Sequence, residues 1–140
     1  MHRSHVRITA TQHALQSVAA TVEAFCATNE IPSATSDLMK LVLDEVLSNI
    51  AKYAYDAPGQ GLIDIELEYS NATFTATVED AGRPFDPLQF KRPDNSGPLK
   101  TRRQGGLGIL FVKRLVDNVR YDRSGNRNKL TLMIKAPPIA

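Results

Sequence analysis

A carboxylate and an amide interrupt an apolar stretch in the first half of this sequence. Glu45 and Asn49 are four residues apart, so in a helix they project from the same side, one turn apart. That side also carries four apolar residues, Leu38, Leu41, Val42 and Val46. We expect this stripe to face the core, where an unpaired carboxylate is destabilising by several kcal/mol. A proton, a cation or a polar ligand would compensate the charge, so the pair indicates a functional site.

The pair offers two kinds of chemistry. Asn49 can give Mg²⁺ a neutral oxygen ligand without cancelling the charge that attracts phosphate. Glu45 can accept a proton from water or a hydroxyl group as a general base. A structural interpretation is also open, in which Asn49 satisfies a buried backbone group and Glu45 pairs with Lys52, which continues the row.

A second cluster, Asp80-Ala-Gly82-Arg-Pro-Phe85-Asp86, directly follows a predicted strand. A buried carboxylate at a strand end can accept a hydrogen bond from an exocyclic amine such as that of adenine. The alternative is a simple turn, because Asp-x-Gly is common at strand ends.

A third cluster, Gly105-Gly106-Leu107-Gly108, opens a predicted helix. Glycines let the backbone approach a ligand closely, and the N–H groups of a first helical turn attract phosphate. The alternative is a hinge with a helix cap. The cluster is neither a Rossmann fingerprint, because no strand precedes it, nor a P-loop, because no Gly-Lys-Ser/Thr follows.

Basic charge is concentrated just before this third cluster. Residues 91–103 contain five basic side chains and one acidic one, Asp94, a local excess of +4, whereas the whole chain has a net charge of +2. The basic residues are Lys91, Arg92, Lys100, Arg102 and Arg103. They favour phosphate binding, although a charge run is usually a solvated face. The small net charge does not argue for nucleic acid.

The composition is typical of one globular domain. The chain has 140 residues, of which 42% are hydrophobic and 23% charged. A single cysteine, Cys26, excludes an internal disulfide, and its apolar surroundings favour a buried thiol. No apolar run is long enough for a membrane span or a signal peptide, so we expect a cytoplasmic protein.

The hydrophobic periodicity predicts an α+β sandwich, with helices on one face of a mostly antiparallel sheet. Helices are expected at 11–28, capped by Thr9 or Thr11, at 33–55, capped by Ser33, and at 107–116. Strands are expected at 5–9, 63–69, 74–78, 119–123 and 129–135. Between the second hairpin strand and Gln104 no period is visible, which predicts a long loop.

The three clusters, in this order and at these separations, resemble the N, G1 and G2 boxes of the GHKL ATPase superfamily. That superfamily includes gyrase, the MutL repair proteins and sensor histidine kinases. The short length, the Pro84-Phe-Asp-Pro87 continuation and the ending Leu-Val-Asp-Asn-Val…Gly-Asn…Leu-Thr-Leu resemble stand-alone anti-sigma factor serine/threonine kinases. The resemblance extends from about Ile8 to Lys135 and implies a Bergerat, or histidine-kinase-like, ATPase fold.

The resemblance implies a role for each residue. Asn49 would coordinate Mg²⁺ on the ATP phosphates, and Glu45 would be the base that accepts a hydroxyl proton. Asp80 would contact the adenine amino group, with Gly82 allowing the turn beneath it. Further nucleotide contacts would come from Lys52, Arg103, Gly105, Gly106, Leu107 and Gly108. The lid would span about 86–104 of a single domain that ends in a tail at 137–140. Two departures are Pro84, where many members have glycine, and Lys52, where related kinases often have histidine.

The function implied by this resemblance is an ATP-dependent serine/threonine kinase that acts as an anti-sigma factor. It would phosphorylate an anti-anti-sigma (STAS-type) antagonist and sequester a sigma factor when unopposed. Homodimerisation is a family expectation, and no direct contact with nucleic acid or membrane is expected. The sequence shows no phospho-accepting histidine box, which argues against a sensor histidine kinase. The alternative is a non-catalytic ATP-binding module that sequesters a regulatory partner.

Overall fold

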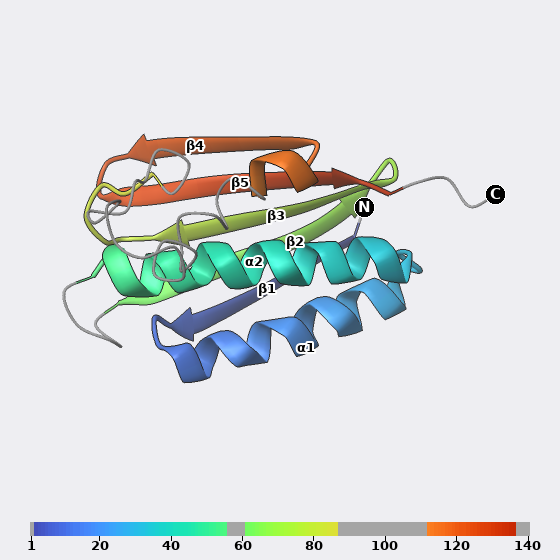
Figure 1. Cartoon of the computed structure of the whole chain (residues 1–140), viewed down its shortest axis with the longest axis horizontal. Coiled ribbons are helices and arrows are strands. Elements are labelled where there is room, and N and C mark those ends of the chain that lie inside the picture. The colour runs from blue at the N-terminus through green and yellow to red at the C-terminus, as the bar shows by residue number, and fades with distance from the viewer. Residues whose placement is uncertain (1, 56–60, 87–111, 137–140) are drawn as a thin grey trace, which may run out of the picture.

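The computed structural model describes residues 2–55, 61–86 and 112–136. Two helices lie against one face of a five-stranded sheet of order β1-β2-β3-β5-β4, in which all four pairings are antiparallel (Figure 1). The elements are β1 (His2–Thr9), α1 (Gln12–Thr28), α2 (Ser33–Tyr53), β2 (Leu62–Ser70), β3 (Thr73–Asp80), β4 (Asn118–Ser124) and β5 (Arg127–Lys135). The predicted α+β sandwich is therefore confirmed.

Helix α1 begins and packs as its sequence predicts. The Thr11 side chain accepts a hydrogen bond from the Ala14 amide at 3.1 Å, which identifies Thr11 as the N-cap. Phe25 lies on the buried side of the helix and stacks on Phe74 of β3, with ring centroids 5.6 Å apart. Cys26 is buried beside it. This face fixes α1 against the sheet.

Helix α2 differs from the prediction at both ends. Its N-cap residue is Pro32, and no side chain caps it, so the predicted Ser33 cap is wrong. Proline fixes φ near the value found here, −55°, and its carbonyl accepts the first helical hydrogen bond from Ser36. The helix ends at Tyr53, two residues before the predicted end.

The predicted core stripe of α2 is wrong at Leu41, which is 60% exposed, and Leu38 is only half-buried. The face that packs on the sheet contains Met39, Val42, Leu43, Val46, Leu47 and Ile50. Leu41 precedes Leu43 by two residues and therefore points about 200° around the helix. As a result Asn49 is buried, whereas Glu45 lies at the border of the packed face.

The two hairpins of the sheet turn where the sequence predicts. Asn71 and Ala72 join β2 to β3 with φ of 54° and 55°, and Gly125 and Asn126 join β4 to β5, with Gly125 at 59°. The strands alternate as predicted, and their inward residues are buried. The core contains Met39, Val46, Ile63, Phe74 and Leu132, each fully buried.

Several predicted features lie outside the described residues. These are the lid except for Asp86, the tail at 137–140, Arg103 and the cluster Gly105, Gly106, Leu107 and Gly108. The predicted helix 107–116 is described only from Val112, and residues 112–115 are helical. In the part of the chain that the structure describes, no helix is long and apolar enough to cross a membrane.

Candidate functional site

Glu45 and Asn49 lie one turn apart on the same side of α2, and their side chains are in contact. The Asn49 side chain is 1% exposed, and its amide Nδ2 donates a hydrogen bond of 3.4 Å to Glu45 Oε1. Among the described residues this is the hydrogen bond of the Asn49 side chain, and none of them donates a hydrogen bond to its amide oxygen. The pair therefore presents a neutral oxygen and a carboxylate on adjacent turns.

The surroundings of Glu45 suit a proton acceptor. Burial raises the pKa of its carboxyl group above the ordinary value. The hydrogen bond from Asn49 and the charge of Lys52 oppose this effect, while the neighbouring Asp44 reinforces it. A raised pKa brings a carboxylate closer to the range in which it works as a general base near neutral pH. Lys52 is itself exposed and reaches Glu45 only through its charge.

Asp80 ends β3 and is buried, with 2% of its surface exposed. Its Oδ2 accepts two hydrogen bonds, from the Gly82 amide at 2.8 Å and from Asn128 Nδ2 at 3.1 Å. Asn128 lies opposite Asp80 in the register of β3 and β5. Both donors contact the same oxygen, so the orientation of the carboxylate is fixed.

The loop after Asp80 is tied to the end of α2. The Arg83 amide donates a hydrogen bond of 3.1 Å to the Ala54 carbonyl, just beyond the last helical residue. A Cβ atom at position 82 would lie 2.5 Å from the Ala54 carbonyl oxygen and 2.9 Å from Asp80 Oδ2. Only glycine therefore fits at position 82. The contact joins the helix of Glu45 and Asn49 to the loop of Asp80.

Two tyrosines border this loop. The Ala81 amide donates to the Tyr55 hydroxyl at 3.2 Å, and the rings of Tyr53 and Phe85 lie 6.1 Å apart. Burial raises the pKa of Tyr55, and the negative charge of Asp80 raises it further. Tyr53 is the last residue of α2 and Tyr55 lies two residues beyond it, so both tyrosines connect the end of the helix to the loop.

The sequence prediction missed Asn128, Tyr121 and Arg123. Asn128 is 3% exposed, and its Oδ1 accepts hydrogen bonds from the Phe85 amide, the Tyr121 hydroxyl and Arg123 Nη1. Arg123 Nη1 also donates to the Gly82 carbonyl at 2.9 Å. A signal was present, since Asn128 occupies an inward position in the alternation of β5, which continues with Leu130, Leu132 and Ile134.

The described residues are compatible with Mg²⁺ but not with an all-protein metal cage. They contain no group of three His, Cys, Asp or Glu residues that could hold a metal ion. Mg²⁺ usually keeps several waters and is bound by one or two protein oxygens together with substrate phosphates. The Asn49 amide oxygen, to which no described residue donates a hydrogen bond, lies beside the Glu45 carboxylate and fits that mode of binding.

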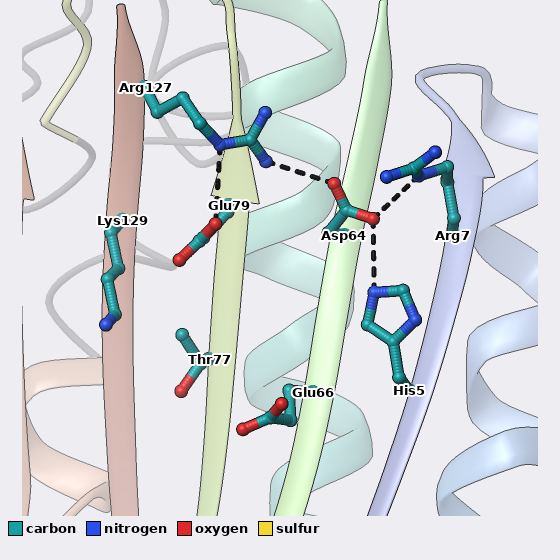
Figure 2. Close-up of a pocket in the computed structure, with 8 residues that line it drawn as sticks. All are labelled: His5, Arg7, Asp64, Glu66, Thr77, Glu79, Arg127 and Lys129. Atoms are coloured by element: carbon teal, nitrogen blue, oxygen red, sulfur yellow. Dashed lines mark hydrogen bonds and ion pairs between the residues drawn. The ribbon is translucent and has the colours of Figure 1, made fainter. Parts of the chain in front are cut away.

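A separate charged cluster lies on the sheet face opposite the helices, in a shallow depression of about 580 Å³ (Figure 2). Asp64 of β2 accepts from Arg7 Nε at 2.8 Å, from His5 Nε2 at 3.1 Å and from Arg127 Nη2 at 3.0 Å. Burial alone would raise the pKa of Asp64, but the hydrogen bonds from Arg7 and Arg127 hold it below its ordinary value. Arg127 also contacts Glu79. These charges are already paired, so they connect strands.

The helix pair, the sheet and the Asn–Asp arrangement define the class of protein. The chain belongs to the histidine kinase-like ATPase domain family, whose sequence profile matches residues 8–134. It is similar to the serine/threonine-protein kinase BtrW of Bordetella bronchiseptica, with 26% identity over 71% of this chain and 70% of that protein. It is also similar to the serine-protein kinase RsbW of Staphylococcus aureus, with 29% identity over 69% of this chain and 64% of that protein.

A solved structure supports the same fold. The crystal structure of the RsbU and RsbW domains of Rv1364c from Mycobacterium tuberculosis superimposes on all of this chain with a TM-score of 0.72. The matched part is 34% of that longer chain, and the sequences are 16% identical. This likeness concerns the fold.

Proposed function

We propose that this chain is an ATP-dependent serine/threonine protein kinase that acts as an anti-sigma regulatory factor. The observation that carries the proposal is the Glu45–Asn49 pair, in which no described residue donates to the amide oxygen and burial raises the pKa of the carboxyl group. The sequence similarity to BtrW and RsbW, both named as kinases, supports it.

In this proposal one end of the site binds the base and the other end carries out the chemistry on the phosphates. Asp80, held by Gly82 and Asn128, accepts a hydrogen bond from the adenine amino group. Asn49 would hold Mg²⁺, which would supply charge neutralisation for the phosphates. Glu45 accepts the proton of a serine or threonine hydroxyl on the protein substrate. Phosphoryl transfer requires mainly positioning and charge neutralisation, and these residues would contribute to both.

The substrate is proposed to be a STAS-type antagonist protein, and the sequestered partner a sigma factor. Phosphorylation of the antagonist would free this chain to bind the sigma factor, and the unphosphorylated antagonist would displace it. A cytoplasmic location follows from these partners. Homodimerisation belongs to the same proposal.

The kinase activity is tested by label transfer from γ-labelled ATP to a purified STAS-type antagonist. The test variant is Glu45→Gln, and the matched control is Asp44→Asn, an exposed carboxylate one residue away. Loss of a general base typically slows a reaction by about 10²–10⁴-fold, so Glu45→Gln should show that loss and Asp44→Asn should not. Thermal unfolding with ATP reports binding, because ligand at a hundredfold excess over Kd adds about 2.7 kcal/mol of stability.

The outcomes distinguish the candidate roles. Label transfer at the wild-type rate by Glu45→Gln would remove the base assignment. Wild-type protein that is stabilised by ATP and transfers no label would instead be a non-catalytic binding module. In the same unfolding assay, Asn49→Ala should abolish the additional stabilisation that Mg²⁺ gives with ATP. If that additional stabilisation persists, Asn49 is not the metal ligand.

A further inference from the structure

Asn128 connects three segments that lie far apart in the sequence. Its Nδ2 donates to Asp80 Oδ2 at 3.1 Å and to the Arg83 carbonyl at 2.9 Å. Its Oδ1 accepts from the Phe85 amide at 3.2 Å, from Arg123 Nη1 at 3.1 Å and from the Tyr121 hydroxyl. The amide has acceptors at its nitrogen and donors at its oxygen, so only one of its two orientations satisfies its neighbours.

This arrangement holds one oxygen of Asp80 from two sides. The Tyr55 hydroxyl interacts with the Asp80 carboxylate, and the hydrogen bonds from Gly82 and Asn128 both end on Oδ2. Rotation of the carboxylate would break both, and the surrounding site is buried, where unpaired polar groups are destabilising. Oδ1 therefore keeps a fixed direction and can accept a hydrogen bond from a ligand.

We infer that Asn128 is a positioning residue that sets the base preference of the nucleotide site. It acts through Asp80, by holding Oδ2 so that Oδ1 points toward the exocyclic amino group of the base. It also holds the backbone of the loop beneath the base through Arg83 and Phe85. Tyr121 and Arg123 bring the β4–β5 hairpin into the same network. The inference rests on the proposed function, which assigns Asp80 to adenine.

The test compares the dissociation constants of ATP and of inosine triphosphate, which carries an oxygen where adenine has its amino group. Asn128→Ala should weaken ATP binding about tenfold and inosine triphosphate binding little, because the lost contact concerns the amino group. Asp80→Ala should remove the ATP preference, and adding Asn128→Ala to it should change the preference no further. This non-additivity is the sign of one residue acting through another.

Tyr121→Phe serves as the second variant, because it removes one donor to Asn128, together with the contact of the hydroxyl group with the Phe85 backbone, and keeps the Asp80 and Asn128 side chains. It should reduce the ATP preference in the same direction and by less. The positioning role is refuted if Asn128→Ala and Tyr121→Phe weaken the binding of ATP and inosine triphosphate equally. It is also refuted if these two variants keep the wild-type preference for ATP while Asp80→Ala loses it. In either case the nucleotide site itself stands. If the wild type binds neither nucleotide, the proposed function itself fails.

Discussion

Substitution of Gly82 by alanine tests the contact between α2 and the loop of Asp80. The added methyl group would lie 2.5 Å from the Ala54 carbonyl oxygen and 2.9 Å from Asp80 Oδ2, so the loop must move. Overpacking of this kind typically destabilises by about 1–3 kcal/mol, and loss of the hydrogen bond from Arg83 to Ala54 adds about 1 kcal/mol. Alanine also restricts the unfolded chain, which offsets about 0.4–1 kcal/mol.

The free energy of unfolding should therefore fall by about 1–3 kcal/mol, measured by urea denaturation. The midpoint of thermal unfolding should fall by about 4 °C for each kcal/mol. ATP affinity, measured by titration calorimetry, should fall about tenfold because the Asp80 carboxylate is displaced with the loop.

The matched control is Gly125→Ala in the β4–β5 turn. Its added Cβ would meet nothing within 4 Å, but Gly125 has a φ of 59°, which disfavours alanine by about 1–2 kcal/mol. This variant should lose similar stability and keep its ATP affinity. The reasoning is refuted if Gly82→Ala retains both its stability, within about 0.5 kcal/mol, and its ATP affinity. It is also refuted if both variants lose ATP affinity equally.

Two further predictions concern charge. If Glu45 is the base, the pKa that defines the acid limb of the pH profile of kcat/KM should lie above the ordinary carboxyl value, because burial raises it. Lys52→Gln should move this pKa to higher pH, and Asp44→Asn should move it to lower pH. Shifts of both variants in the same direction would contradict the assignment. Asp64 has a lowered folded-state pKa, so its stabilising effect is present above the ordinary carboxyl range and is lost as pH falls through the folded pKa. Asp64→Asn should therefore lower the free energy of unfolding, measured by urea denaturation, by about 1 kcal/mol at pH 7. This difference from the wild type should become smaller in acid. A difference that does not change with pH would contradict the pairing.

The sequence predicts the fold well because the signals are local. The alternation along β2 and β3, the turn at Asn71 and the Thr11 cap each depend on a few neighbouring residues. The border of the buried face of α2 was less predictable. Leu41 fits an apolar stripe by spacing, but the sheet selects the stripe centred on Leu43 and Val46, and that choice depends on contacts distant in sequence.

In the candidate site too, the features that depend on local sequence are predictable and those that depend on distant contacts are not. Glu45, Asn49 and Asp80 are recognisable because polar groups interrupt apolar patterns. Asn128 lies 48 residues after Asp80 and becomes its neighbour only through the register of β3 and β5. The contact between Gly82 and Ala54 likewise depends on where α2 ends, which periodicity alone does not fix.

The hydrogen bond from Arg83 to the Ala54 carbonyl has a consequence for the spacing of the site. It anchors the loop of Asp80, the proposed base-binding end, to a residue five positions after Asn49. A helix rises 1.5 Å per residue, so about 7.5 Å of helix axis separates the proposed metal ligand from this loop. The length of the helix between Asn49 and Ala54 thus sets the distance between the two proposed ends of the nucleotide site. One inserted residue would lengthen it by about 1.5 Å and turn Asn49 by about 100° relative to the loop. The spacing of the proposed site therefore depends on the number of residues between Asn49 and Ala54.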